Sequence, residues 1–283
     1  FINSPYIMEL SIPPSIKEFK DGWCKSTECL NYIFISPENE NFKLIDCQLM
    51  VGKTNIKNKD FDDLLFCIRK IVYVNIPPNI TRISSFSFSN CFKLKFFEIP
   101  ENSKLYTICH DAFNGSPIRY LFIPSQLAEL KNGWCANTPI LNEICISPKN
   151  KHFKLIEEKM IVGKSCPDSE VYDVLEFACR DIEEAKIPSC IKFISPFCFE
   201  KCKRLKSIRF NDDSNITIIG NDAFGKTHIE SLYIPAHLTE LKNGWCANIP
   251  NLNEIYVSSK NKHFKLIEEK MIVGKSCPDN EVY

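Results

Sequence analysis

The chain lacks a net charge, a long apolar run and a recognisable leader. Its 35 basic residues balance its 35 acidic residues, so no electrostatic feature points to nucleic acid or an anionic membrane as a partner. No uninterrupted apolar stretch approaches the roughly 18 residues of a membrane span, and we therefore expect no direct membrane insertion. Residues 1–10 lack the basic start and the apolar run of a signal peptide. The classes left to weigh are a protein-interaction module and an enzyme.

Metal-ligand spacing is also missing. The 15 cysteines contain no C-x-x-C pair, and the five histidines do not stand near cysteines at zinc-ligand spacing. Fifteen is an odd number of cysteines, and it lies below the ~8–10% of a disulfide scaffold. We predict no metal site and no cofactor.

What the chain does have is a long repeat without gaps. Trp23, Trp134 and Trp245 recur at one constant spacing, and residues 130–172 return as residues 241–283 with six differences in 43 positions. Such a period is typical of a stacked array, in which each repeat contacts only its neighbours. We predict one continuous array over residues 1–283, a fragment of a longer one, with blocks at 12–122, 123–233 and, incomplete, 234–283.

Each block divides into shorter coils that begin at an apolar residue, usually followed by proline. The stretch from Leu94 to Ile99 has apolar residues at positions 1, 4 and 6, and the alternation of positions 4 and 6 predicts a half-buried strand. A proline after the strand cannot donate a ladder hydrogen bond and ends it. We predict that successive strands form a parallel sheet. In the middle of the chain, the coils begin at Ile76, Ile99, Ile123, Ile146 and Ile187.

The fourth coil of a block is longer by about one β-hairpin. Residues 152–163 contain two short apolar strands around Glu157-Glu158, and residues 174–178 supply a third strand. Paired catalytic carboxylates are the weaker interpretation of the two glutamates, because adjacent strand residues point to opposite faces. We predict that residues 153–180 protrude from the stack and return to it at Ile182.

These patterns resemble the BspA-like leucine-rich repeat family, whose repeat runs roughly L-x-x-I-x-I-P-x-x-V-x-x-I-x-x-x-A-F-x-x-C-x-x-L. Residues 76–83 read I-P-P-N-I-T-R-I, and they continue to Phe88, Cys91 and Leu94. Cys91 and Cys202 occupy the cysteine position of this repeat, where a small side chain is usually buried, so we expect both to be core thiols. The chain departs from the pattern where a Gly-Trp-Cys triplet replaces A-F and where Ser116 and Thr227 replace the cysteine.

The resemblance covers essentially the whole chain and implies both fold and function. It implies a leucine-rich-repeat solenoid (a horseshoe or right-handed superhelix), β-dominated, with a parallel concave sheet, short turns on the convex side and inserted β-hairpins. It also implies a non-enzymatic protein-interaction module in a cell-surface or extracellular adhesin that binds host matrix or cell-surface proteins. A cytoplasmic scaffold for an internal protein partner is the alternative. The glycosylation sequons at Asn79, Asn114 and Asn215 permit the extracellular location.

A cysteine nucleophile is the enzyme alternative. His152 and His263 are each followed, at the same short spacing, by a cysteine, Cys166 and Cys277, and a Cys/His pair can perform nucleophilic catalysis. Both pairs belong to the repeated hairpin, which explains why they recur together. Catalysis also needs an enclosed site, whereas stacked repeats offer grooves. We predict no catalytic residue.

The hairpin cysteines are exchanged in pairs between the first two blocks. Two disulfides are therefore candidates, Cys47–Cys67 and Cys166–Cys179, and paired thiols would indicate an oxidising compartment. Independent drift among free thiols is the competing interpretation, because connectivity cannot be read from sequence. Cys47 and Cys67 of the first block correspond to Glu158 and Ala178 in the second. Cys166 and Cys179 of the second block correspond to Asn55 and Ile68 in the first.

Strand alternation also predicts a binding surface. If positions 1, 4 and 6 of each strand are buried, positions 3 and 5 face the concave side. Aromatic side chains there supply large contact area and are enriched at binding hot spots, although aromatics also favour strands for packing reasons alone. The predicted ligand-binding residues are Tyr32, Phe34, Tyr73, Phe96, Tyr120, Phe122, Tyr233 and Tyr256.

Overall fold

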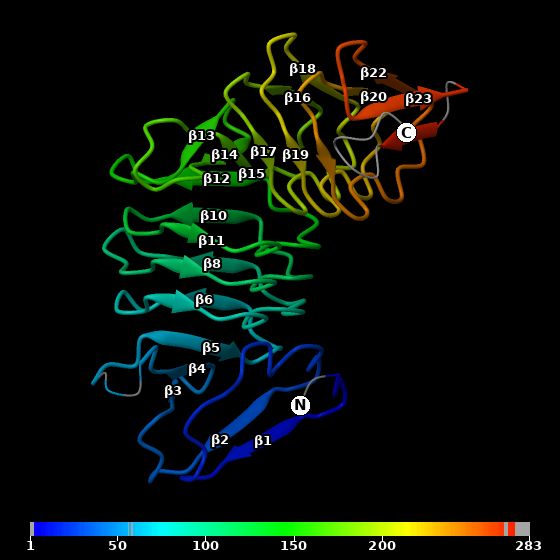
Figure 1. Cartoon of the computed structure of the whole chain (residues 1–283). Coiled ribbons are helices and arrows are strands. Elements are labelled where there is room, and N and C mark those ends of the chain that lie inside the picture. Colours follow the sequence, from blue (N-terminus) through cyan, green and yellow to red (C-terminus); the bar gives the residue numbers. More distant parts are fainter. Residues whose placement is uncertain (1–2, 56, 58, 269–270, 275–283) are drawn as a thin grey trace. The chain divides into compact units, whose positions relative to one another are not determined.

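The computed structural model describes residues 3–55, 57, 59–268 and 271–274, and every regular element within these ranges is a β-strand. A search of the same ranges finds no helix that could cross a membrane. The chain divides into two compact units, unit 1 (Phe1–His152) and unit 2 (Phe153–Tyr283), which follow each other from blue to red in Figure 1. Each unit is a β-solenoid, as predicted. The single continuous array over residues 1–283 stays a prediction.

Unit 1 carries two rows of strands. The ladder strands open the coils and pair in parallel, β1 with β2, β6 with β8 and β10 with β12. The second row is one sheet in the order β11-β9-β7-β5-β4-β3. The ladder strands are β1 (Glu9–Ile12), β2 (Tyr32–Ile35), β6 (Tyr73–Asn75), β8 (Phe96–Glu98), β10 (Tyr120–Ile123) and β12 (Glu143–Ile146). The second row comprises β3 (Lys43–Ile45), β4 (Leu49–Gly52), β5 (Asp63–Cys67), β7 (Arg82–Ile83), β9 (Thr107–Ile108) and β11 (Glu129–Leu130).

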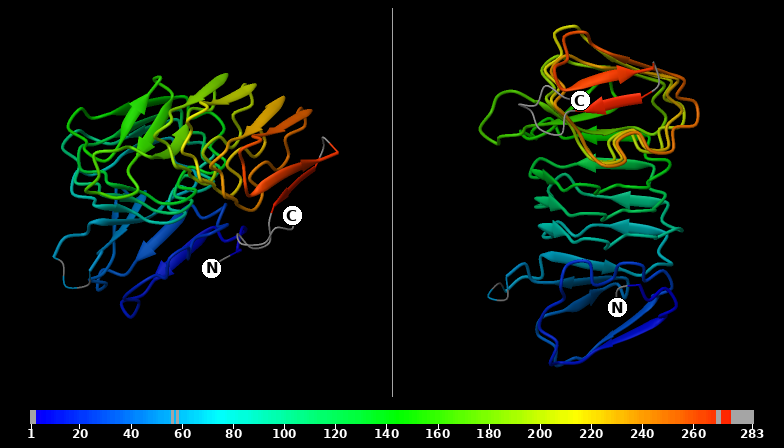
Figure 2. Two further views of the ribbon diagram at one scale, coloured as in Figure 1. Left: turned by 45° about the horizontal axis from the view of Figure 1, so that its top comes forward. Right: turned by 45° about the vertical axis from the view of Figure 1, so that its right-hand side comes forward.

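Unit 2 repeats this plan, and its coils superimpose in the right-hand view of Figure 2. Its second row is a sheet in the order β13-β14-β15-β17-β19-β21, and β23 and β24 form a separate hairpin. The ladder strands are β16 (Glu184–Ile187), β18 (Ser207–Phe210), β20 (Ser231–Ile234) and β22 (Glu254–Val257). The other strands are β13 (Lys154–Ile156), β14 (Met160–Gly163), β15 (Val174–Ala178), β17 (Phe193–Ile194), β19 (Ile218–Ile219), β21 (Glu240–Leu241), β23 (Phe264–Ile267) and β24 (Met271–Gly274).

The coil that contains β8 and β9 shows how the sequence makes the two rows. Its ladder strand alternates, so that Phe97 is 4% exposed whereas Phe96 is 59% exposed. Pro100 follows the strand and ends its hydrogen bonding, after which the chain turns into β9 of the second row. Leu94 and Ile99 are also buried, which confirms the predicted burial of positions 1, 4 and 6.

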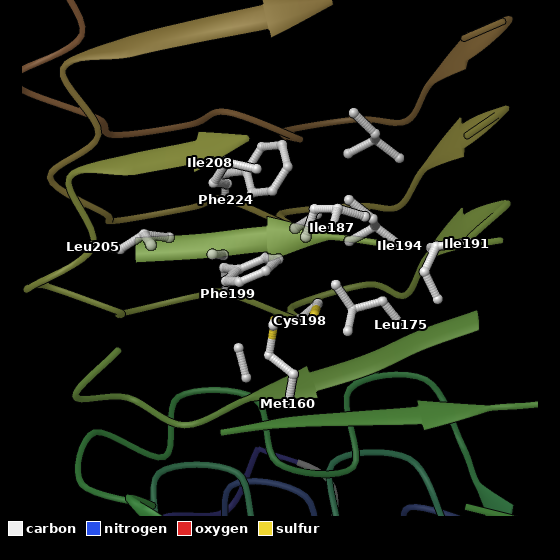
Figure 3. Close-up of a cluster of buried hydrophobic side chains, with 14 of the residues drawn as sticks. Met160, Leu175, Ile187, Ile191, Ile194, Cys198, Phe199, Leu205, Ile208 and Phe224 are labelled. Atoms are coloured by element: carbon white, nitrogen blue, oxygen red, sulfur yellow. The ribbon is translucent and has the colours of Figure 1, made fainter. Parts of the chain in front are cut away.

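A column of aromatic rings runs through the core of each unit. In unit 1, the ring centroids of Phe88 and Phe113 are 5.3 Å apart, and Trp134 meets Phe113 edge-on at 6.3 Å. The Gly-Trp-Cys departure therefore leaves the column intact, because an indole takes the place of a phenyl ring. In unit 2, the centroids of Phe199 and Phe224 are 5.6 Å apart, and Figure 3 shows both rings among the aliphatic side chains that fill the space between the two rows.

The prediction that residues 153–180 protrude from the stack is wrong. β15 pairs in parallel with β17, and β14 and β13 continue the same sheet as antiparallel strands. Met160, Ile161 and Phe177 are fully buried, and at about 1.5–3 kcal/mol for each large side chain their burial holds the hairpin in the sheet. The predicted turn is confirmed, because Glu157 and Glu158 have φ angles of 48° and 56°, the left-handed conformation of a type I′ turn.

An asparagine ahead of each hairpin is hydrogen-bonded to the preceding coil. The side-chain amide of Asn150 donates to the carbonyl oxygens of Pro124 and Leu127, at 2.7 and 2.9 Å. Asn39 and Asn261 make the same two hydrogen bonds in the other blocks. These three residues form what we call the asparagine clamp, which joins the segment ahead of each hairpin to the coil before it.

Candidate binding surface

Alternation in the ladder strands brings a row of aromatic rings to the surface of unit 1. Tyr73, Phe96 and Tyr120 occupy the same position in β6, β8 and β10 and are 50%, 59% and 41% exposed. We call these three residues the aromatic row. β6 pairs with β8, and β10, which pairs with β12, lies next to β8, so the three rings form an apolar strip along the ladder face. The labels in Figure 1 show β6, β8 and β10 one above the other.

The strands hold the aromatic row from behind. Tyr73 and Phe96 are register partners in the β6–β8 pair. Next to Phe96, Phe97 points inward and packs edge-on against the core rings of Phe88 and Phe113, with centroids 5.2 and 4.8 Å away. The exposed rings are therefore preorganised, and a ligand would not have to order the strands that carry them.

Polar groups border the aromatic row. The Tyr73 hydroxyl donates a hydrogen bond to Glu98 Oε2 at 3.1 Å, and this bond raises the pKa of Tyr73. Burial, followed by the nearby Cys145 thiol, raises the pKa of Tyr120. Both phenols are therefore protonated at neutral pH and keep a hydroxyl for a ligand. Arg119 lies beside the row, with Nε 3.5 Å from Glu143 Oε1.

The other two predicted residues in the first coils line a groove beside the hairpin. Tyr32 and Phe34 are 45% and 56% exposed, and they border a cavity of about 540 Å³ between β2 and the β3–β4 hairpin. Lys70 Nζ lies 4.1 Å from the centroid of the Tyr32 ring, a cation–π contact. Leu44, Ile68 and Lys70 also line this groove, and they were not predicted because a hairpin that protrudes from the stack would not reach β2.

The predicted residues of the later coils are less uniform. Phe122 is half-buried and is the register partner of the exposed Cys145. Tyr233 and Tyr256 are register partners in unit 2; Tyr233 is half-buried, whereas Tyr256 is 54% exposed. The Tyr256 hydroxyl donates to Glu254 Oε2 at 2.8 Å, and this hydrogen bond raises the pKa of Tyr256.

The long repeat gives the aromatic row an internal comparison. One repeat after Tyr73, Phe96 and Tyr120, the corresponding residues are Glu184, Ser207 and Ser231. Glu184 and Ser207 pair in the register that Tyr73 and Phe96 use, and an ion pair between Arg209 and Glu184 at 3.3 Å takes the place of the Tyr73–Glu98 hydrogen bond. The fold therefore does not require aromatic residues at these positions.

The candidate disulfide cysteines are free thiols in the structure. Each candidate pair joins an exposed residue to a buried one: Cys47 and Cys166 are exposed, whereas Cys67 and Cys179 are buried. Burial raises the pKa of Cys179 to about 12. The pairings Cys47–Cys67 and Cys166–Cys179 stay predictions.

The repeat cysteines are where the sequence placed them. Cys91 and Cys202 are both fully buried, which confirms them as core thiols. In the coils where the cysteine is replaced, the hydroxyl of Ser116 donates to the carbonyl oxygen of Phe88, and the hydroxyl of Thr227 donates to that of Phe224 at 2.8 Å. The two hydroxyls are therefore satisfied inside the core.

The enzyme alternative gains nothing from the geometry. The Cys166 thiol is exposed in the loop between β14 and β15, and Glu157 and Glu158 form an exposed turn. Cys277 and Glu269 lie outside the described residues. A search of the described ranges finds no group of three His, Cys, Asp or Glu side chains that could hold a metal ion.

The three sequons differ in the surroundings of their asparagines. Asn79 and Asn215 are exposed, and their amides donate to the carbonyl oxygens of Phe61 and Ser189 at 2.8 and 3.0 Å. The half-buried Asn114 donates to Asp111 Oδ1 at 2.7 Å. Asn79 and Asn215 are therefore the more accessible acceptors for a glycan.

Comparison with known families identifies the repeat. The model of the BspA type leucine rich repeat region matches residues 54–161 and 175–273, in six copies. No curated protein matches the chain.

Solved structures share the fold at low sequence identity. The chain is similar to the pneumococcal vaccine antigen PcpA, with a TM-score of 0.61 and 16% identity over 90% of this chain and 63% of that chain. It is also similar to a leucine rich cell surface protein from Faecalibacterium prausnitzii A2-165, with a TM-score of 0.58 and 16% identity over 93% of this chain and 76% of that chain. A leucine-rich repeat protein from Eubacterium ventriosum ATCC 27560 gives a TM-score of 0.53 and 18% identity over 87% and 60% of the two chains.

Proposed function

Because this chain belongs to the BspA-type leucine-rich repeat family, we propose that it is a protein-binding segment of a cell-surface adhesin whose ligand is a host matrix or cell-surface protein. The observation that carries the proposal is the aromatic row. Large exposed rings cost solubility, and the second copy of the same coils dispenses with them. Their presence in unit 1 is therefore best explained by a ligand that covers them.

The composition of the surface also suits a protein ligand. An apolar strip with a polar border has the composition of an interface core and rim. The phenol groups of Tyr73 and Tyr120 combine apolar area with a hydrogen-bonding tip, which is why tyrosine is enriched at hot spots. The groove at Tyr32 and Phe34 would extend the contact along the ladder face of unit 1, if one ligand spans both.

The test is binding of the whole chain to immobilised fibronectin, laminin, fibrinogen and collagen. Tyr120→Ser with Phe122→Ser should weaken binding to the matrix protein that the wild type retains, and should leave the melting temperature nearly unchanged. Tyr106→Ser is the matched control, because Tyr106 is 49% exposed but lies next to the second row. Equal binding by the double variant would remove the aromatic surface from the proposal, and absence of wild-type binding to all four proteins would count against a matrix ligand.

A cytoplasmic scaffold is the second candidate. Reduced thiols at Cys47, Cys67, Cys166 and Cys179 in the native protein would favour it, because cytosolic proteins keep their thiols reduced. Protease shaving of intact source cells, with mass spectrometry of the released peptides, separates the two candidates. Peptides released from intact cells support the adhesin, whereas peptides seen only after lysis support the scaffold.

A further inference from the structure

A buried arginine lies between the coils of unit 1. Arg69 is 4% exposed, and its guanidinium lies 4.4 Å from the centroid of the Phe66 ring. It donates to the carbonyl oxygens of Ser87 and Thr27 at 2.9 and 3.1 Å, and its Nη1 lies 3.7 Å from Cys91 Sγ. In the described ranges Arg69 donates to carbonyl oxygens, a hydroxyl and the thiols of Cys91 and Cys24, and burial raises the pKa of Cys24 to about 11. A buried cation is costly without a counter-charge, and the Cys91 thiol is the partner here that can supply one.

That thiol is one of a pair. Cys67 and Cys91 are both fully buried, and their side chains are hydrogen-bonded to each other. Burial opposes ionisation of Cys91, but the hydrogen bond to Cys67 and the charge of Arg69 outweigh it and lower the pKa of Cys91 to about 7. Burial, followed by the hydrogen bond to Cys91, raises the pKa of Cys67. The pair therefore consists of a nucleophilic sulfur and a protonated neighbour in contact with it.

Unit 2 carries the same arginine without a counterpart of Cys67, although the buried Cys179 lies close to Cys202. Arg180 is also buried, with its guanidinium 4.4 Å from the centroid of Phe177 and Nη1 3.8 Å from Cys202 Sγ. The residue one repeat after Cys67 is Ala178. Burial raises the pKa of Cys202, whereas that of Cys91 is lowered. The second thiol is one difference between the two sites; the others are Asp181 and Glu200, which also raise the pKa of Cys202 and stand where unit 1 has Lys70 and Ser89.

We propose that Cys67 and Cys91 form a disulfide that joins the end of β5 to the turn between β7 and β8. The oxidant is a small peroxide. The Cys91 thiolate attacks one peroxide oxygen, the O–O bond breaks, and a sulfenic acid and hydroxide result. The Cys67 sulfur then attacks the sulfenic sulfur and forms the S–S bond; hydroxide leaves and takes the Cys67 proton as water. Two electrons pass from the two sulfurs to the peroxide.

Burial selects both the oxidant and the partner. Because neither thiol is exposed, oxidation has to follow a local opening of the coil, and a small oxidant needs a smaller opening than a peptide disulfide. Cys47 is exposed and lies in a hairpin turn, whereas Cys67 already contacts Cys91. The structure therefore assigns Cys91, rather than the sequence candidate Cys47, as the partner of Cys67. The disulfide would close a loop within one block. Once oxidised, Cys91 would no longer supply a negative charge to Arg69, and Arg69 would then resemble Arg180, whose neighbour Cys202 stays protonated.

The test uses the full chain, reduced and then treated with hydrogen peroxide, followed by alkylation in denaturant and peptide mapping without reductant. We expect a peptide that links Cys67 to Cys91, a melting temperature higher by roughly 5–10 °C in the linked protein, and a rate of linking that rises with pH as the thiolate fraction grows. Linkage of Cys67 to Cys47, or of Cys91 to the buried Cys24, would overturn the proposal. So would alkylation of Cys67 and Cys91 as fully as Cys202.

Two variants keep the test sharp. Cys67→Ala introduces the residue that unit 2 carries at the same position, so it should fold; it should lose both the link and the rise in melting temperature. Cys202→Ala changes the corresponding buried thiol of unit 2 and should keep both effects. A peroxide-dependent rise in melting temperature that persists in Cys67→Ala would contradict the proposal.

Discussion

Corresponding coils of the two units use one backbone plan and carry different side chains on their ladder faces. In unit 1, Tyr73 and Phe96 are exposed register partners; in unit 2, their counterparts are Glu184 and Ser207. Inside the coils the aromatic column stays the same, as Phe88 and its counterpart Phe199 show. The coil core therefore has to meet a packing requirement, whereas the ladder face is free to change. An exposed aromatic residue on the ladder face therefore indicates binding, because packing does not require it there, whereas a buried phenylalanine is explained by packing alone.

The largest effect should come from the part that the units share. Phe88→Ala and Phe199→Ala should each lower the free energy of unfolding by about 3–5 kcal/mol, since each removes a fully buried ring from the aromatic column. Urea denaturation, with amide exchange to locate the loss, measures it. Phe92→Ala is the control, because Phe92 is 60% exposed. A cost below about 1 kcal/mol for one of the two core rings would show that the cores are not equivalent.

The next effect should come from exchanging the faces. Tyr73→Glu, Phe96→Ser and Tyr120→Ser together give unit 1 the residues of unit 2, and they should weaken binding to the matrix ligand at least about 30-fold. The melting temperature should stay within a few degrees, because unit 2 carries these residues in the same register. Biolayer interferometry and thermal unfolding measure the two outcomes. The reverse exchange, Glu184→Tyr with Ser207→Phe and Ser231→Tyr, is the complementary variant; a fall in binding there would contradict the assignment of the ligand to unit 1.

A smaller difference between the units should appear with pH. Glu176 of unit 2 stands where unit 1 has Leu65, and burial raises the pKa of Glu176 to about 7 although Ser195 donates a hydrogen bond to it. Between the ordinary value of 4.5 and about 7 the folded protein holds a proton that the unfolded chain releases. The contribution of protonated Glu176 to the stability of the fold is therefore fully present below pH 4.5, and it is lost as the pH rises through 7.

Glu176→Gln removes this proton and should stabilise the protein at pH 8 by up to about 2 kcal/mol, with little effect at pH 4.5. Urea denaturation at the two pH values measures the change. Glu183→Gln is the control, since Glu183 is exposed and paired with Arg204. An equal change at both pH values would show that Glu176 is not the titrating group.

The smallest effect should come from a single hydroxyl. Tyr73→Phe keeps the ring of the aromatic row and removes the hydrogen bond to Glu98. Because the pair is exposed, ligand affinity should change by no more than about threefold. A loss close to that of the three-residue exchange would mean that the ligand reads the hydroxyl rather than the apolar strip.

Short-range patterns predicted much of this fold. Alternation between Phe96 and Phe97 predicted a half-buried strand, and proline predicted its end; both signals depend on neighbouring residues, so they can be read from the sequence. The buried position of Cys91 followed in the same way from its place in the repeat. Most of these features recur from coil to coil, and the period shows which positions correspond.

The remaining features depend on contacts between segments. The hairpin residues Met160 and Phe177 look like ordinary strand residues, and nothing local shows that β15 pairs with β17. Arg69 is harder still, because its partners are mostly backbone carbonyls, which every residue has. The groove at Tyr32 was missed because the packing of the hairpin against the stack cannot be read locally. The contact between Cys67 and Cys91 was missed because it joins residues of different segments around Arg69.

The asparagine clamp has a consequence for folding fidelity. The hairpins after Asn150 and Asn261 are almost identical in sequence, so during synthesis either could dock onto the wrong preceding coil, the error to which repeat proteins are prone. The carbonyl partners of each clamp lie only 23 and 26 residues earlier in the chain. Closing a loop of that size is entropically cheaper than closing one that is longer by a whole repeat. Proximity along the chain thus gives each copy its correct neighbour when the sequences cannot tell the copies apart.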